Sequence, residues 1–208
     1  MSVWRTHITA VLDPLSSAGA AIGQSDYDLN PQDRPTTTVS LRPAAVLVPI
    51  VEHSDGATML LTRRADTLRQ HTGQIAFPGG RCDPGESVVE TALREAEEEV
   101  GLDRTFVEIV GLLTPYQTVT GYAVTPVVGF VRPGFRLTLN PGEVAEAFEA
   151  PFDFLMDTAN HLRHHLEPHD GGERRYYYAM PYEDYYIWGA TAGMLRGFSD
   201  RLEGAKVV

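Results

Sequence analysis

Three glutamates share one face of a predicted helix. In "REAEEEV", residues 94–100, Glu95, Glu98 and Glu99 stand at positions i, i+3 and i+4, which are neighbouring positions on a helix surface. Like charges placed in this way destabilise a helix by about 0.2–0.5 kcal/mol for each pair. Hard divalent cations take carboxylate oxygens as ligands. The cluster therefore predicts a site for a hard divalent cation such as Mg²⁺, whose charge would offset the repulsion.

The alternative is a solvated acidic face on which Arg94 pairs with Glu90 or Glu98 at four-residue spacing. Two features favour the metal. A helical wheel places the three clustered carboxylates next to an apolar stripe, and the Gly-rich segment "FPGGRCDPGE" comes directly before the helix. The apolar stripe comprises Val88, Val89, Ala92, Leu93, Ala96 and Val100, and the solvent side comprises Glu86, Glu90 and Glu97.

The predicted helix has marked ends. Asp83 is placed to cap its N-terminus, Pro84 suits the first helical position, and Glu86 stands three residues after the cap. Gly101 fits the position just past the C-terminus. This helix must carry the acidic cluster to the edge of the core.

The elements around this helix indicate an α/β fold. Apolar runs predict strands at 44–51, 58–64, 106–113 and 123–132, a strand passing into a short helix at 144–155, and late strands in "RRYYYAM" and "YYIW". Residues 189–202 predict a closing helix, and residues 1–42 predict a helix and loose connector that precede a domain over residues 43–208. Strands and helices in this order favour a layered domain with a mixed sheet.

Composition and charge limit the possible partners. The chain has 208 residues, is 43% hydrophobic and carries a formal net charge of −11. This charge argues against a nucleic-acid backbone or an anionic membrane as a partner. The N-terminus lacks a signal pattern, no apolar run approaches the length of a membrane span, and Cys82 is a lone cysteine. We expect a cytoplasmic protein that acts on a small molecule, as a monomer or a homodimer.

The segment "GRCDPGESVVETALREAEEEVGL", residues 80–102, resembles the Nudix box, Gly-x5-Glu-x7-Arg-Glu-U-x-Glu-Glu-x-Gly-U with U aliphatic. The named slots are filled by Gly80, Glu86, Arg94, Glu95, Glu98, Glu99 and Gly101, and the aliphatic slots by Ala96 and Leu102. The resemblance implies an α/β/α sandwich around a mixed sheet. It also implies Mg²⁺- or Mn²⁺-dependent hydrolysis of a nucleoside diphosphate linked to another group.

In enzymes of that family the glutamates equivalent to Glu95, Glu98 and Glu99 hold the metals, and one of them can act as base. The resemblance implies that Arg94 and Glu86 orient the loop and helix. Metal ions lower the pKa of bound water and clamp phosphate oxygens, so a net-acidic protein can still handle an anionic substrate. Glu143, in "NPGEV", is a second candidate for the base, and a solvent-facing turn carboxylate is the equal alternative.

Upstream, "LLTRRADTLRQHTGQIAFPGG", residues 60–80, resembles the signature of a Nudix subgroup that hydrolyses coenzyme A (CoA). The resemblance implies cleavage of CoA into 3′,5′-ADP and 4′-phosphopantetheine. Guanidinium groups bind phosphate in bidentate fashion, so Arg64 and Arg69 are candidates for binding the ribose 3′-phosphate. Gly79 and Gly80 are expected to let the backbone approach phosphate closely, and Phe77 to pack in the core.

Other functions stay open from the sequence. A broader Nudix pyrophosphohydrolase acting on ADP-ribose or NADH is the nearest alternative, and a ligand-sensing module without turnover would be expected to have lost box carboxylates. The histidines of "NHLRHHLEPHD" have metal-ligand spacing in part, but surface imidazoles explain them better. One of the late aromatic residues could stack on adenine, although strand packing is the simpler account.

Overall fold

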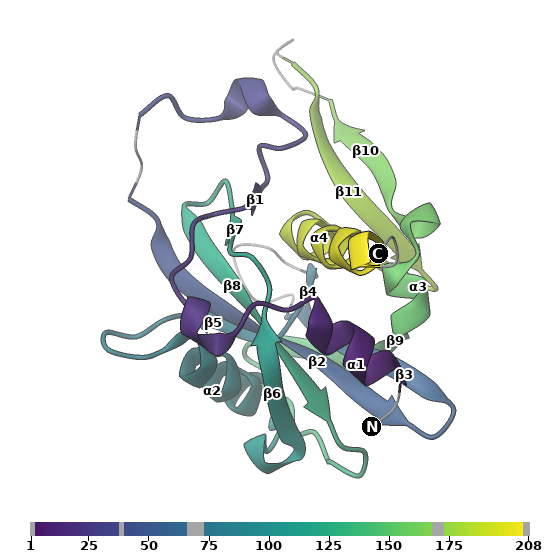
Figure 1. The fold of residues 1–208 in the computed structure, drawn as a ribbon. Coiled ribbons are helices and arrows are strands. Elements are labelled where there is room, and N and C mark those ends of the chain that lie inside the picture. Colours follow the sequence, from purple (N-terminus) through teal and green to yellow (C-terminus); the bar gives the residue numbers. More distant parts are fainter. Residues whose placement is uncertain (1–2, 38–39, 66–72, 168–172, 206–208) are drawn as a thin grey trace.

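The computed structural model describes residues 3–37, 40–65, 73–167 and 173–205. A large mixed sheet has helices packed on both of its faces, and a three-stranded antiparallel sheet lies beside the C-terminal helix (Figure 1). This architecture confirms the predicted α/β/α sandwich around a mixed sheet.

Within these described residues the elements have the following bounds. The large sheet contains β1 (Gln24–Ser25), β2 (Arg42–His53), β3 (Gly56–Arg64), β4 (Ile75–Ala76), β5 (Gly79–Arg81), β6 (Val107–Leu112), β7 (Tyr116–Gln117), β8 (Tyr122–Val131) and β9 (Val144–Pro151). The small sheet contains β10 (Leu162–Leu166), β11 (Arg175–Tyr182) and β12 (Tyr185–Trp188). The helices are α1 (Val3–Ala10), α2 (Val88–Val100), α3 (Phe152–Met156) and α4 (Ala190–Ala205), and the 3-10 turns are η1 (Leu15–Ser17), η2 (Pro31–Asp33), η3 (Arg104–Phe106) and η4 (Thr158–Asn160).

Strand β2 is the centre of the large sheet. It runs parallel to β8, with Arg42 opposite Tyr122, and forms an antiparallel hairpin with β3, with Ile50 opposite Met59. Its apolar run is buried along most of its length, as expected for a strand covered on both faces. The predicted strands and hairpin are confirmed, as is the passage of β9 into the short helix α3.

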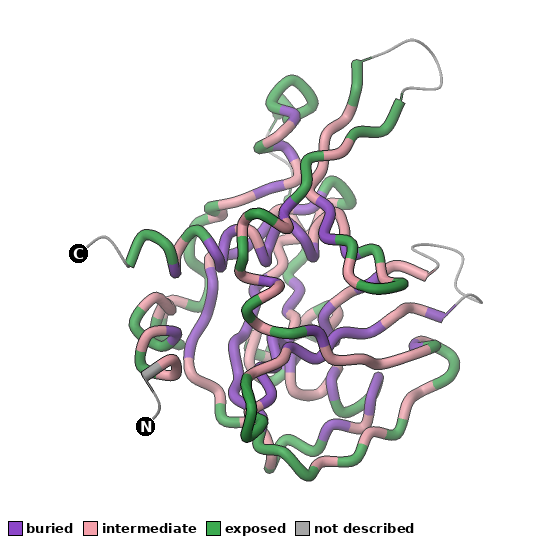
Figure 2. Tube along the Cα trace, turned by 90° about the vertical axis from the view of Figure 1, so that its right-hand side faces the viewer, coloured by how far each residue is buried: buried purple, intermediate pink, exposed green. Residues whose placement is uncertain are grey.

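Two cores lie on the two sides of the sheet. Helix α2 packs on one face through Ala92 and Ala96, against Leu47 of β2. Helices α1, α3 and α4 pack on the other face, around the buried rings of Phe130 and Phe198. Figure 2 shows buried positions gathered in the strands and in the helices that cover them, with exposed positions along the loops. In the part of the chain that is described, no helix has the length and apolarity needed to cross a membrane.

The N-terminal segment is attached to both sheets. Helix α1 is present as predicted, but the residues after it are held in place rather than forming a loose connector. Strand β1 pairs in parallel with β7, with Gln24 opposite Tyr116. Asn30, only 1% exposed, donates to the carbonyl oxygen of Tyr176 at 2.8 Å and accepts from its backbone N–H at 2.6 Å.

Candidate active site

Helix α2 begins one turn later than the sequence predicted. The prediction that Asp83 caps it is wrong: Ser87 is the N-cap, its hydroxyl accepts from the backbone N–H of Glu90, and the Glu90 carboxylate accepts from the backbone N–H of Ser87. The backbone N–H of Glu86 instead donates to the Asp83 carbonyl oxygen at 3.0 Å, which closes a separate turn before the helix. Gly101 ends the helix with φ 68°, the left-handed conformation that glycine adopts without strain, as predicted.

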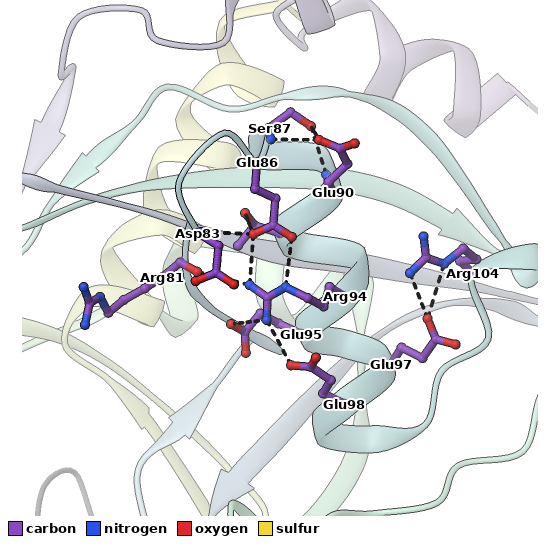
Figure 3. Close-up of polar contacts among 11 residues, drawn as sticks. Arg81, Asp83, Glu86, Ser87, Glu90, Arg94, Glu95, Glu97, Glu98 and Arg104 are labelled. Atoms are coloured by element: carbon purple, nitrogen blue, oxygen red, sulfur yellow. Dashed lines mark hydrogen bonds and ion pairs between the residues drawn. The ribbon is translucent and has the colours of Figure 1, made fainter.

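Arg94 joins three of the box glutamates (Figure 3). Its guanidinium donates to both carboxylate oxygens of Glu86 at 2.9 and 3.0 Å, and to Glu95 and Glu98 at 2.9 Å each. It also donates to the carbonyl oxygen of Arg81 at 3.2 Å. Arg94 therefore braces the loop before α2 against the helix, which is what the family resemblance implies.

Glu86 is not on the solvent side, where the helical wheel placed it. It precedes α2, and its carboxylate accepts from Arg94, from the hydroxyl of Thr91 at 2.8 Å and from the backbone N–H of Asp83 at 3.1 Å. These donors, with Arg94 the strongest, lower the pKa of Glu86 to about 2. Its negative charge is fully matched, so Glu86 serves as an anchor for Arg94.

Glu99 lies at the buried end of the acidic stripe. Only 4% of this residue is exposed, and its carboxylate accepts from the backbone N–H of Gly79 at 3.2 Å. Burial is the main cause that raises the pKa of Glu99 to about 7. The carboxylate thus points at the glycine pair of β5 and has too few donors to stabilise its charge.

Glu95 and Glu98 differ in exposure. The Glu95 side chain is 15% exposed and that of Glu98 56% exposed. A side chain on Gly80 would lie 2.3 Å from the Glu95 carboxylate oxygen, so the glycine leaves the space that this carboxylate fills. At Gly79, a side chain would lie 2.5 Å from the carbonyl oxygen of Ala45, so the close approach of β5 to β2 requires glycine there.

Glu143 is brought to the same site by the loop that follows β8. The backbone N–H of Asn140 donates to the carbonyl oxygen of Glu99 at 2.9 Å, and the Asn140 amide donates to the Glu143 carboxylate at 3.2 Å. The negative charge of Glu143 contributes to raising the pKa of both Glu95 and Glu99, after the larger effect of burial. Three carboxylates from two distant segments therefore repel one another at this point.

The donor set fits a hard divalent cation. Every candidate ligand offers carboxylate oxygen, which Mg²⁺ prefers, and the mutual repulsion of Glu95, Glu99 and Glu143 leaves a deficit of positive charge. Among the described residues, no group of three His, Cys, Asp or Glu side chains is already arranged as a metal site. Arg94 holds Glu95 and Glu98, and Gly79 holds Glu99. Each of these carboxylates uses one oxygen in these bonds, so its second oxygen can serve as a metal ligand.

Arg64, at the end of β3, lies next to this carboxylate cluster. Its positive charge lowers the pKa of Glu99, against the larger raising effect of burial. Its Nε atom is buried and has no hydrogen-bond partner within the described residues. Arg63, by contrast, pairs with Glu146 at 3.2 Å. The other arginine of the predicted set, Arg69, lies outside the described residues.

A cavity of about 630 Å³ is lined by Arg64 and Val46, and the described lining includes none of the acidic stripe. Its walls come from residues 24–29, from β7 and β8, from β11 and β12, and from α4. No sequence pattern predicted this cavity, because these segments are far apart in the chain and meet only in the fold. Phe77, predicted to pack in the core, is 3% exposed and does so.

The described histidines of this segment, His161, His164 and His165, do not form a metal site. They lie on or directly before the strand β10 rather than on a helix, so their spacing does not place them on one face. His161 is buried against the carbonyl oxygen of Leu155, His164 bonds to Tyr186 and His165 to Glu167. His169 lies outside the described residues.

The fold and the acidic helix define a class of hydrolase, and comparison with known proteins identifies the family. A family model for the NUDIX domain matches residues 41–171. The chain belongs to the Nudix hydrolase family.

Relatives named uncharacterized Nudix hydrolase NudL include a protein from Photorhabdus laumondii, 42% identical over 78% of this chain and 86% of its own length. One from Yersinia pestis is 43% identical over 77% of this chain and 80% of its own length. Among solved structures, a MutT/nudix family protein from Enterococcus faecalis is 16% identical, with a TM-score of 0.48, covering 83% of this chain and 66% of that chain.

Proposed function

We propose that this enzyme hydrolyses the diphosphate bond of CoA or its derivatives to 3′,5′-ADP and 4′-phosphopantetheine, with Mg²⁺ or Mn²⁺. One observation carries the proposal. Arg64, from the segment that resembles the CoA signature, pairs across the sheet with Val144, the residue after Glu143. Its positive charge also lowers the pKa of Glu99, from the Nudix box. The two motifs therefore contribute opposite charges to the same site, as binding of a metal-complexed diphosphate requires.

The box carboxylates Glu95, Glu98 and Glu99 would hold the metal, which supplies charge neutralisation for the diphosphate and a lower pKa for bound water. Glu143, held by Asn140, faces the same cluster and is the proposed base that accepts the proton of the attacking water. The proposed alternative is a box glutamate in that role. Arg94 donates a hydrogen bond to Glu95 and to Glu98, and its proposed role is to position these two carboxylates.

Arg64 would bind the diphosphate, since its charge acts on the proposed metal-binding carboxylates and its Nε has no hydrogen-bond partner among the described residues. In the proposed mechanism, the backbone of Gly79 and Gly80 approaches the phosphates closely. Charge stabilisation and positioning carry most of the catalysis of phosphoryl transfer.

A substrate panel tests the proposal. The purified protein is incubated with Mg²⁺ and CoA, ADP-ribose or NADH, and the products are identified by mass. We expect 3′,5′-ADP and 4′-phosphopantetheine from CoA, with a higher kcat/KM than for the other two. Faster cleavage of ADP-ribose or NADH would replace CoA specificity with a broader pyrophosphohydrolase. Binding without turnover of any of the three would indicate a ligand-sensing module.

A further inference from the structure

The cavity that Arg64 lines is also lined by two further arginines, Arg175 and Arg196. Arg175, the first residue of β11, is half-buried and lines the cavity. Within the described residues its guanidinium makes no hydrogen bond or ion pair, whereas its neighbour Arg174 pairs with Glu167 at 3.0 Å. Despite the net charge of −11, this guanidinium has no anionic partner among the described residues, and it lines a cavity whose wall is aromatic in part.

The carboxylates in the same cavity are already occupied. Asp26 accepts from the hydroxyl of Tyr116 and from the backbone N–H of Val119, both at 2.9 Å. Asp28 pairs with Arg34, and Asp200 with Arg196, each at 2.9 Å. None of these three carboxylates forms an ion pair with Arg175, so its guanidinium can pair with an anionic ligand.

The backbone at Arg175 is held in position. The next residue, Tyr176, exchanges two hydrogen bonds with the buried side chain of Asn30. Across the small sheet, Arg175 is paired with Leu166, which also lines the cavity. A guanidinium on such a fixed strand loses less entropy when it binds a ligand than one on a free loop.

Arg64 and Arg175 have different neighbours, and the third arginine of the lining, Arg196, pairs with Asp200. Arg64 acts on Glu99, so it belongs to the diphosphate end. Arg175 acts on Tyr116, at the wall formed by β7 and the N-terminal segment. A substrate that satisfies both must carry an anionic group separate from its diphosphate. Trp188 and Tyr177, whose ring centroids are 5.3 Å apart, line the cavity beside Arg175 and offer planar surfaces to a base.

We propose that Arg175 binds a second phosphate of the substrate, one that lies outside the bond that is cleaved. This inference rests on the proposed function, and for CoA the group is the ribose 3′-phosphate. Guanidinium binds a phosphate dianion through two parallel hydrogen bonds. The 3′-phosphate was predicted to bind to Arg64 and Arg69; Arg64 is assigned to the diphosphate, and Arg175 takes the additional charge.

Kinetics on paired substrates test this role. In Arg175→Gln, we expect the KM for CoA to rise about 10-fold or more, the loss expected for a charge-assisted hydrogen bond, while kcat changes little. The KM for 3′-dephospho-CoA should stay the same, because this substrate lacks the group. Arg175→Lys keeps the charge but not the bidentate geometry, so its KM for CoA should lie between those of the wild type and Arg175→Gln. Arg174→Gln is the matched control and should match the wild type on both substrates.

Equal effects of Arg175→Gln on the two substrates, or no effect on either, would overturn the inference and leave the CoA activity standing. If the wild type cleaves neither substrate, the proposed function fails, and calorimetry decides the inference separately. The wild type should then bind adenosine 3′,5′-bisphosphate more tightly than 5′-AMP, and Arg175→Gln should remove that preference. Equal binding of the two nucleotides by the wild type would also overturn it.

Discussion

The glutamates at the two ends of the Nudix box have opposite environments. Glu86, before α2, receives donors from Arg94, Thr91 and the backbone, and its pKa falls to about 2. Glu99, in the last turn of α2, is buried with one backbone donor, and its pKa rises to about 7. The same residue type in one motif is therefore saturated with donors at one end and short of them at the other.

This difference in hydrogen-bond donors distinguishes a structural glutamate, Glu86, from a candidate metal ligand, Glu99. A carboxylate whose donors are all in place stabilises the fold and has nothing left to offer a ligand. A carboxylate that is buried with few donors destabilises the fold until a cation arrives, as is common for groups at functional sites. Arg94 connects the two ends, since it binds Glu86 on one side and Glu95 and Glu98 on the other (Figure 3).

The largest expected effect is on turnover. Glu99→Gln should lower kcat/KM on the preferred substrate by more than about 100-fold, because loss of outer-shell partners alone costs a metal site 10- to 100-fold. Glu97→Gln is the matched control on the same helix, since Glu97 points away from the stripe and pairs with Arg104 (Figure 3). Steady-state kinetics across Mg²⁺ concentrations measure both. Similar kcat/KM values for the two variants would show that Glu99 is not needed for catalysis.

The same variant should have the opposite effect on stability. A carboxyl group with a raised pKa destabilises the folded protein as pH rises from the unfolded value near 4.5 to about 7, and the cost is constant above that. Glu99→Gln removes this cost, so it should stabilise the metal-free protein at pH 8 by about 2–3 kcal/mol and leave it almost unchanged at pH 4.5. Urea unfolding in the presence of a chelator measures this. Destabilisation at pH 8 would mean that the charge of Glu99 is already stabilised by its partners in the folded, metal-free protein.

The sequence predicted one of these two environments and not the other. The box and its apolar stripe place Glu95 and Glu99 at the edge of the core, because helical periodicity is local. The position of Glu86 was wrong, because the wheel extended the helix through Asp83, whereas Ser87 and Glu90 cap it one turn later. The prediction considered Asp83 alone, whereas Ser87 and Glu90 form the reciprocal hydrogen bonds of a capping box.

Sequence patterns could not predict the cavity, for a different reason. Its walls join residues 24–29 to β11 through Asn30 and Tyr176, a contact that spans most of the chain and has no periodic signature. Arg175 stands in "ERRYYY", where nothing distinguishes it from Arg174. Only the fold shows that one of these arginines has a carboxylate partner and the other faces the cavity.

The smallest expected effect is that of a substitution at Glu86, on stability. Glu86→Gln keeps the shape of the side chain but removes its charge, so it should lower the free energy of unfolding by about 2 kcal/mol at pH 7, the range for hydrogen bonds to charged groups. A lowered pKa stabilises the fold above the unfolded value near 4.5, and this contribution is lost as pH falls toward about 2. The difference in the free energy of unfolding between Glu86→Gln and the wild type should therefore be constant from pH 8 to about 5 and become smaller below pH 5. Glu97→Gln should have almost the same free energy of unfolding as the wild type. Urea unfolding across this range measures it, and a gap that widens as pH falls would contradict the assignment of Glu86 as the anchor of Arg94.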